Sequence, residues 1–205
     1  MSNDPRCRSR RVSSPHLCRC LSISLVSRAS QSQPQEGGGI YRKTFLHSAP
    51  PVHIETDGVY ARSKVSPSAI VASSTPALGA SASSASVIAT ATIVNAGVKA
   101  GATATVKYEL FDANGALTGS ASSSPVTLPA ASSKSVPSTA TTAPVTIAVA
   151  SAELWSVARP YLYTLRTSVT GGDSLNTSIG IYWTKWTGDQ GFFLNNQHVK
   201  IRGFW

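Results

Sequence analysis

The segment Thr103–Gly115 reads TATVKYELFDANG, and it carries the clearest structural signal in the chain. Apolar residues stand at positions 106, 108 and 110, and charged residues stand between them. This alternation predicts a strand with one face in a core and the other in water. The closing residues Asp112–Gly115 are a strong signal for a hairpin-type turn. The segment therefore predicts an antiparallel strand that ends in a tight turn.

Segments of the same kind lie on both sides of this strand. Turn residues, as in Asp57-Gly58, Asn95–Gly97 and Gly171–Ser174, separate them, and no segment sustains a helical period over three turns. The pattern predicts an all-β fold, an immunoglobulin-like β-sandwich of about seven short strands without the disulfide. The other predicted strands are Val59–Val65, Ser86–Val94, Leu117–Ser123, Val126–Leu128, Val145–Val149, Tyr161–Val169 and Ser178–Trp183.

Composition divides the chain into four parts. The first is rich in Ser, Arg and Gln, has no strand or helix period, and predicts a disordered N-terminal head. The second holds a strand-like run, Ile40–Leu46, and the alternating Val52–Ile54. The last is a linker followed by a hairpin that turns at Asn195-Asn196. The four predicted parts are residues 1–36 (head), 37–54, 55–184 (sandwich) and 185–205 (linker and orphaned hairpin).

The net charge of +9 raises the question of a nucleic-acid or membrane partner. The predicted sandwich, however, holds seven basic and six acidic residues, so the basicity belongs mainly to the flanks. No basic stripe with interleaved aromatic residues occurs in the sandwich, which argues against a nucleic-acid partner. No apolar run approaches the roughly 18 residues of a membrane span, so we expect no membrane partner.

All three cysteines, Cys7, Cys18 and Cys20, lie in the predicted head, and the sandwich has none. The sequence therefore predicts no disulfide and no thiolate site in the sandwich. Their spacing does not resemble that of metal ligands, and we expect neither a metal nor a cofactor. The Arg-rich, acid-poor head has the composition of an organelle transit peptide but no amphipathic period, and no signal peptide is evident.

Four carboxylates lie well inside the predicted sandwich. Asp112 and Asp173 fall in turns, where the usual role of Asp is to accept hydrogen bonds from nearby backbone N–H groups. Glu109 lies on the polar face of its strand, and Glu153 precedes Leu154-Trp155. None forms a recognisable catalytic pair. His47, His53 and His198 are scattered, and no nucleophile motif accompanies them, so we expect no catalytic residue in this chain.

One triplet, Asn176-Thr177-Ser178, has the form of an N-glycosylation site and is expected in a loop between strands. Such triplets also occur by chance. Asn176 is therefore a candidate glycosylation site, and it favours a secreted parent protein.

Three stretches resemble glycoside hydrolase family 2, which includes β-galactosidases, β-glucuronidases and β-mannosidases. Gly38–Arg42 (GGIYR), followed by Pro51–Ile54 (PVHI), resembles the end of the N-terminal jelly-roll domain. Glu153–Tyr163 (ELWSVARPYLY) resembles a segment of the immunoglobulin-like second domain, with Val157 where Pro is usual. Gly191–Gly203 (GFFLNNQHVKIRG) is similar to the hairpin that leads into the (β/α)8 barrel.

The resemblance implies a fragment of an enzyme that hydrolyses O-glycosyl bonds. In the family, two glutamates on the barrel perform a retaining double displacement, and both lie beyond the hairpin. No catalytic residue can therefore be assigned to a position here, and we expect the chain to be inactive alone. A glycoside would be a substrate only of the intact parent. The sandwich would support the parent by packing on the jelly-roll and barrel domains.

Two alternatives remain. A free-standing sandwich could bind carbohydrate or another protein, with a dense aromatic group near the end of the chain as its contact surface. Its members are Tyr182, Trp183, Trp186, Phe192 and Phe193. A shortened or misassembled gene product is the second alternative. Glycoside specificity cannot be predicted from these residues.

Overall fold

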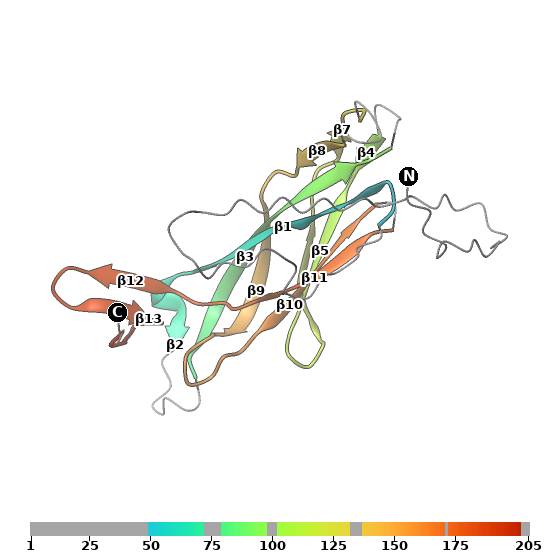
Figure 1. Cartoon of the computed structure of the whole chain (residues 1–205). Helices are drawn as coiled ribbons and strands as arrows, with labels where there is room; N and C mark the ends of the chain where they lie inside the picture. Colours follow the sequence, from blue (N-terminus) through green and yellow to red (C-terminus); the bar gives the residue numbers. More distant parts are fainter. Residues whose placement is uncertain (1–48, 72–78, 98–101, 132–136, 171, 202–205) are drawn as a thin grey trace, which may run out of the picture. The chain divides into compact units, whose positions relative to one another are not determined.

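The computed structural model describes residues 49–71, 79–97, 102–131, 137–170 and 172–201 (Figure 1). The predicted head, residues 1–36, and the strand-like run Ile40–Leu46 lie outside the described residues. The described residues form fourteen strands and one short 3-10 helix, Pro67–Ala69. None of the helical structure among them is long and apolar enough to cross a membrane.

A long central strand organises the first sheet. Strand β3 pairs with β1 and β2 along one edge and with β8 and β9 along the other, always antiparallel (Figure 1). The predicted strand Ser86–Val94 is the middle of β3. The strands of this sheet are β1 (Val52–Val65), β2 (Ile70–Val71), β3 (Ser81–Asn95), β8 (Ser138–Thr141) and β9 (Val145–Glu153).

The second sheet has the order β11-β10-β5-β6, again antiparallel. Its strands are β5 (Val106–Phe111), β6 (Leu117–Ser122), β10 (Tyr163–Val169) and β11 (Ser174–Ile179). The remaining strands of the described residues form two small sheets. They are the pair β4 (Ala102–Ala104) with β7 (Val126–Leu128), and the sheet of β12 (Thr184–Thr187), β13 (Gly191–Leu194) and β14 (Gln197–His198).

The core lies between the two large sheets, because alternate residues of each strand turn inward. In β5, Val106, Tyr108 and Leu110 are fully buried, while Lys107 lies on the opposite face and is exposed. The pattern in the opening segment therefore predicted the inward face of this strand correctly. Strands β3, β9 and β10 contribute further buried residues, including Val87, Ile93, Ile147, Val149 and Leu165. The all-β, immunoglobulin-like sandwich is confirmed.

Two tyrosines place their hydroxyl groups inside this apolar region. The Tyr108 hydroxyl lies 3.0 Å from Thr142 Oγ1, and burial raises the pKa of Tyr108 above its usual value. The Tyr163 hydroxyl accepts a hydrogen bond from the Glu153 backbone N–H at 2.8 Å, and burial raises the pKa of Tyr163 as well. Both phenols therefore combine a buried ring with a satisfied polar atom.

The turn predicted at Asp57-Gly58 is instead a bulge inside β1. The strand therefore continues across the boundary that was predicted between residues 54 and 55. Asp57 has a φ of 58°, and the register of β1 against β3 shifts between Ile54 and Val59. A side chain at Gly58 would place its Cβ 3.1 Å from the Thr92 carbonyl oxygen and closer still to Glu55. Glycine therefore lets the bulged strand stay against β3.

The strand predicted at Ser178–Trp183 is displaced. Strand β11 ends at Ile179, and residues 180–183 connect it to β12. Within this link, the Ile181 carbonyl accepts a hydrogen bond from the Trp155 backbone N–H at 2.7 Å instead of pairing in a sheet. The short strands β2 and β8 carry too few residues to show a period, and the sequence did not predict them.

Candidate functional site

Glu109 and Glu153 lie in ion pairs. Glu109 Oε1 is 2.6 Å from Lys107 Nζ, two positions away on the same face of β5. Glu153 Oε2 is 3.0 Å from Arg159 Nη1, and the Arg159 guanidinium also lies 5.5 Å from the centre of the Tyr161 ring. The contacts of Arg159 with Glu153 and Tyr161 lie at the bend that follows β9.

Asp112 and Asp173 hold backbone segments. Asp112 Oδ1 accepts hydrogen bonds from the N–H groups of Asn114 and Ala116 at 2.9 and 2.8 Å, as the turn pattern predicted. Asp173 behaves differently, because its Oδ2 accepts a hydrogen bond from the Ile54 N–H at 2.7 Å. Asp173 was expected to accept a hydrogen bond from a nearby backbone N–H group. Its hydrogen bond is instead a long-range one, which joins the β10–β11 turn to β1.

The structure also places the remaining predicted residues. His53 Nδ1 lies 2.8 Å from the Pro50 carbonyl oxygen, and the His198 ring packs edge-on against Phe193, while His47 lies outside the described residues. Asn176 is exposed, but it stands in the middle of β11 and not in a loop. Its position was misjudged because the polar sequence of this edge strand, SLNTSI, alternates too weakly to be recognised.

An apolar groove lies where the β12–β14 sheet meets the sandwich. Its volume is about 570 Å³. Trp186 is 69% exposed and packs on Phe192 with the ring centres 4.6 Å apart. The residues of this apolar groove are Trp155, Val157, Leu162, Gly180, Tyr182, Thr184, Trp186, Phe192, Leu194, Val199 and Ile201. The aromatic group noticed in the sequence is therefore divided, because Trp183 packs against the core and Phe193 against His198.

One buried asparagine fastens the hairpin to the sandwich and so shapes the apolar groove. Asn195 Oδ1 accepts a hydrogen bond from the Trp183 N–H, and its Nδ2 donates one to the Trp155 carbonyl, both at 2.9 Å. The neighbouring Asn196 donates from Nδ2 to the Pro67 carbonyl. Both asparagines have positive φ, 51° and 63°, so the predicted Asn-Asn turn is confirmed.

The apolar groove also depends on a glycine in the link. A Cβ at Gly180 would lie 3.0 Å from Trp155 Cβ and 3.1 Å from its Cγ. Trp155 can therefore lie against the link only because position 180 has no side chain. The Trp155 ring then meets the Tyr182 ring edge-on at 6.2 Å.

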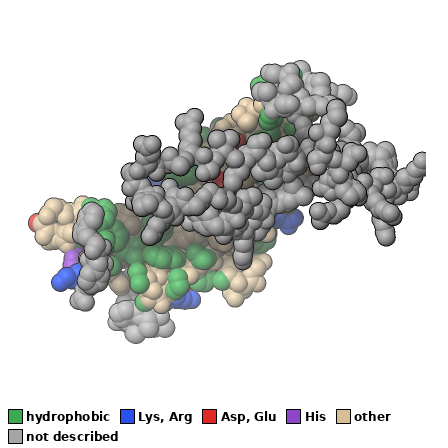
Figure 2. Space-filling view, viewed as in Figure 1, with side chains coloured by type: hydrophobic (Ala, Val, Ile, Leu, Met, Phe, Trp, Pro, Cys, Tyr) green, Lys and Arg blue, Asp and Glu red, His purple; other side chains and the backbone are tan. Residues whose placement is uncertain are grey.

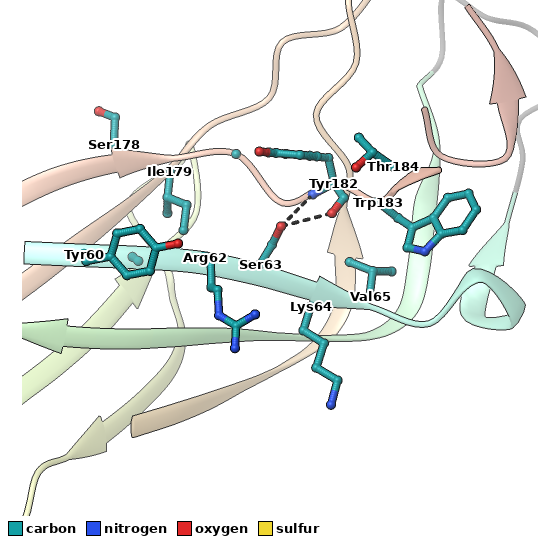
Figure 3. Close-up of a pocket in the computed structure, with 12 residues that line it drawn as sticks. Tyr60, Arg62, Ser63, Lys64, Val65, Ser178, Ile179, Tyr182, Trp183 and Thr184 are labelled. Atoms are coloured by element: carbon teal, nitrogen blue, oxygen red, sulfur yellow. Dashed lines mark hydrogen bonds between the residues drawn. The ribbon is translucent and has the colours of Figure 1, made fainter. Parts of the chain in front are cut away.

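A second groove, of about 580 Å³, lies between β1 and the end of β11 with its link (Figure 3). Figure 3 shows Arg62 and Lys64 leaving one side of β1, while Ser63 leaves the other side towards Tyr182. We call this the polar groove; it is lined by Tyr60, Ala61, Arg62, Ser63, Lys64, Val65, Ser178, Ile179, Gly180, Tyr182, Trp183 and Thr184. The sequence gave no sign of it, because its two walls lie more than 100 positions apart.

The Ser63 hydroxyl joins the two walls of the polar groove. It donates a hydrogen bond to the Tyr182 carbonyl at 3.0 Å and accepts one from the Tyr182 N–H at 3.2 Å. The link after β11 is thereby tied to β1. In the space-filling view, apolar side chains lie scattered among polar side chains and backbone over the visible described residues (Figure 2).

Comparison with known structures finds the same fold in much longer proteins. A glycosyl hydrolase family 2 member from Bacteroides cellulosilyticus DSM 14838 aligns with a TM-score of 0.56 and 21% identity, over 75% of this chain and 18% of that one. A beta-glucuronidase from glycoside hydrolase family 2 aligns with a TM-score of 0.56 and 18% identity, over 74% of this chain and 15% of that one. A Bacteroides uniformis beta-glucuronidase gives 0.55 and 21%, over 75% and 17%.

This chain thus spans less than a fifth of the length of these structures. A search of curated proteins found no match. The sequence model of the glycosyl hydrolases family 2 matches residues 74–181, which include β3, β8 and β9 of the first sheet, the whole second sheet and Trp155. Because this match covers more than half of the 205 residues, the chain belongs to glycosyl hydrolase family 2.

Proposed function

We propose that the chain is a supporting, non-catalytic module of a family 2 glycoside hydrolase and does not hydrolyse glycosides by itself. One observation carries the proposal: the family match falls on the sandwich, and the chain spans less than a fifth of its solved relatives. The carboxylates of the sandwich add support. Glu109, Glu153, Asp112 and Asp173 each hold a neighbouring cation or backbone N–H.

The apolar groove is the surface on which we expect a further domain of the longer enzyme to pack. Exposed apolar area at Val157, Trp186 and Ile201 is unusual for a surface in water and is typical of an interface. The groove borders the hairpin that resembles the approach to a barrel. The sandwich and hairpin would then hold that domain at a set position.

The first test is a glycosidase assay of the purified chain on aryl β-galactosides, β-mannosides and β-glucuronides. We expect no turnover above the blank. Four variants serve as controls: Glu109→Gln, Glu153→Gln, Asp112→Asn and Asp173→Asn. Turnover that is equal in all four and in the original chain would come from a contaminating enzyme and leave the proposal standing. Turnover that disappears in any one of them would overturn it.

The second test addresses the apolar groove through the variant Trp186→Ser. We expect the original chain to enhance the fluorescence of the dye anilinonaphthalene sulfonate, which binds exposed apolar surface, and Trp186→Ser to lose most of this enhancement. Leu117→Ser is the matched control, because Leu117 is an exposed apolar residue outside the groove.

An equal loss of dye fluorescence in both variants would contradict the assignment of the groove. Sedimentation velocity on the same samples tests a different occupant. A dimer of the original chain that Trp186→Ser dissociates would assign the groove to a second copy of this chain and overturn the packing proposal.

A further inference from the structure

The polar groove contains two cations for which the described residues provide no partner. Lys107 and Arg159 each pair with a glutamate, whereas no ion pair or hydrogen bond among the described residues involves the side chain of Arg62 or Lys64. Both side chains are exposed on β1. The two residues stand two positions apart on the strand, so their side chains leave the same side of it. Their Cα atoms lie roughly 7 Å apart.

No acidic residue of the neighbouring strands offsets these two charges. The part of β3 that pairs with them, Ala85–Thr90, has no charged residue, and neither does β11. The nearest acidic residue on β1 is Asp57, which lies at the bulge, roughly 17 Å along the strand from Arg62. The charge of this side of β1 is therefore positive and suits an anionic ligand.

Tyr60 stands on the same side of β1 as the two cations and is 65% exposed. A tyrosine ring offers a rigid, flat and amphipathic surface at a low cost in conformational entropy. Such a ring suits the apolar face of a sugar.

The walls of the groove are held before any ligand arrives. β1 is paired with β3 along its length, and Ser63 ties β1 to the Tyr182 backbone through two hydrogen bonds. The positions of Tyr60 and the two cations on the strand are thereby set, which lowers the ordering cost of binding. Ser178 and Thr184 add hydroxyl groups to the lining.

We propose that the β1 wall of the polar groove binds an acidic oligosaccharide along the side of the strand that carries Tyr60, Arg62 and Lys64; its carboxylates pair with Arg62 and Lys64 while a sugar ring lies on Tyr60. Two cations are too few for nucleic acid, for which proteins commonly contact about 6–10 phosphates. This inference does not rest on the proposed supporting role, and either can fail without the other.

The test is isothermal titration calorimetry of the full chain with tetragalacturonate at low salt. We expect binding that weakens as salt is added, because exposed charges are screened. Fully methyl-esterified tetragalacturonate has the same sugar rings without the negative charges, and we expect it to bind at least fivefold more weakly. Tetraglutamate has the charges without the sugar rings, and we expect it to bind more weakly too.

Variants locate the site. Arg62→Ser and Lys64→Ser should each weaken tetragalacturonate binding about fivefold, because each removes one charge-assisted pair at an exposed site. The double variant should abolish measurable binding, and Tyr60→Ser should weaken binding of the charged oligosaccharide. Lys107→Ser is the matched control, since it removes the same charge from a strand outside the groove.

Three results with the oligosaccharide and one with the peptide would overturn the proposal. They are no heat of binding with tetragalacturonate, equal binding of its methyl ester, and equal binding by the Arg62→Ser, Lys64→Ser double variant. Equal affinity for tetraglutamate would also overturn it, because the groove would then recognise acidic peptides. Urea unfolding midpoints equal to that of the original chain show that the variants remain folded.

Discussion

Replacing Asn195 with alanine should lower the free energy of unfolding by about 2–4 kcal/mol. The side chain is only 2% exposed and joins Trp183 to Trp155 through both ends of its amide. Its removal leaves one backbone N–H and one carbonyl without their partners in a partly buried place. Alanine is also strained at a φ of 51°, where asparagine is tolerated. Urea unfolding followed by tryptophan fluorescence measures the loss, because both partners are tryptophans.

Two further variants separate the amide from the backbone strain. Asn195→Gly removes the amide at a residue that accepts positive φ, and it should lose nearly as much stability as alanine if the amide dominates. Asn196→Ala has the same strain but loses only a surface hydrogen bond to Pro67, so we expect a smaller effect, about 1 kcal/mol. Equal losses in Asn195→Ala and Asn196→Ala would contradict the fastening role of Asn195.

Replacing Tyr108 with alanine should cost about 3–5 kcal/mol of unfolding free energy, the range for a buried aromatic residue. Tyr108 is the largest fully buried side chain among the described residues, and it lies at the centre of the opening segment. Its removal leaves a cavity between the two sheets. Urea unfolding measures the effect. Leu175→Ala, on edge strand β11 and partly exposed, is the control and should cost less than about 1 kcal/mol.

Tyr108→Phe keeps the ring and tests the hydroxyl alone. It removes the contact with Thr142 Oγ1 and should cost about 1 kcal/mol. Burial raises the pKa of Tyr108 in the folded state, so its contribution is present below pH about 10 and is lost as the pH rises through the folded-state pKa. Stability of the original chain should therefore fall above pH 10.

The phenylalanine variant should show a shallower fall of stability with alkaline pH. The fall should not vanish, because burial also raises the pKa of Tyr163. Unfolding midpoints measured between pH 8 and 11 provide the comparison. Identical pH dependence in the two proteins would show that ionisation of Tyr108 is not coupled to unfolding.

Much of the sandwich was predictable because it rests on local patterns. The alternation at Val106, Tyr108 and Leu110 predicted a buried face, and all three side chains are fully buried. Weak or short signals were missed. β11 is a polar edge strand, and its residue Asn176 was expected in a loop.

The grooves were harder to predict than the strands. The sequence showed an aromatic group near Trp186, but not that Trp183 turns into the core while Trp186 stays exposed. It also gave no reason to connect Arg62 and Lys64 with Tyr182. Their proximity results from the pairing of sheets that are built from distant parts of the chain.

The sequence by itself determined the all-β fold class, the Asp112–Gly115 and Asn195-Asn196 turns, and the family. These depend on side-chain alternation and on backbone preferences that act over a few residues. Only the tertiary structure decided that Asp173 holds Ile54 and that Ser63 holds Tyr182, each pair 119 positions apart. The physical reason is that such contacts form only when the two sheets pack, and packing depends on the whole core at once.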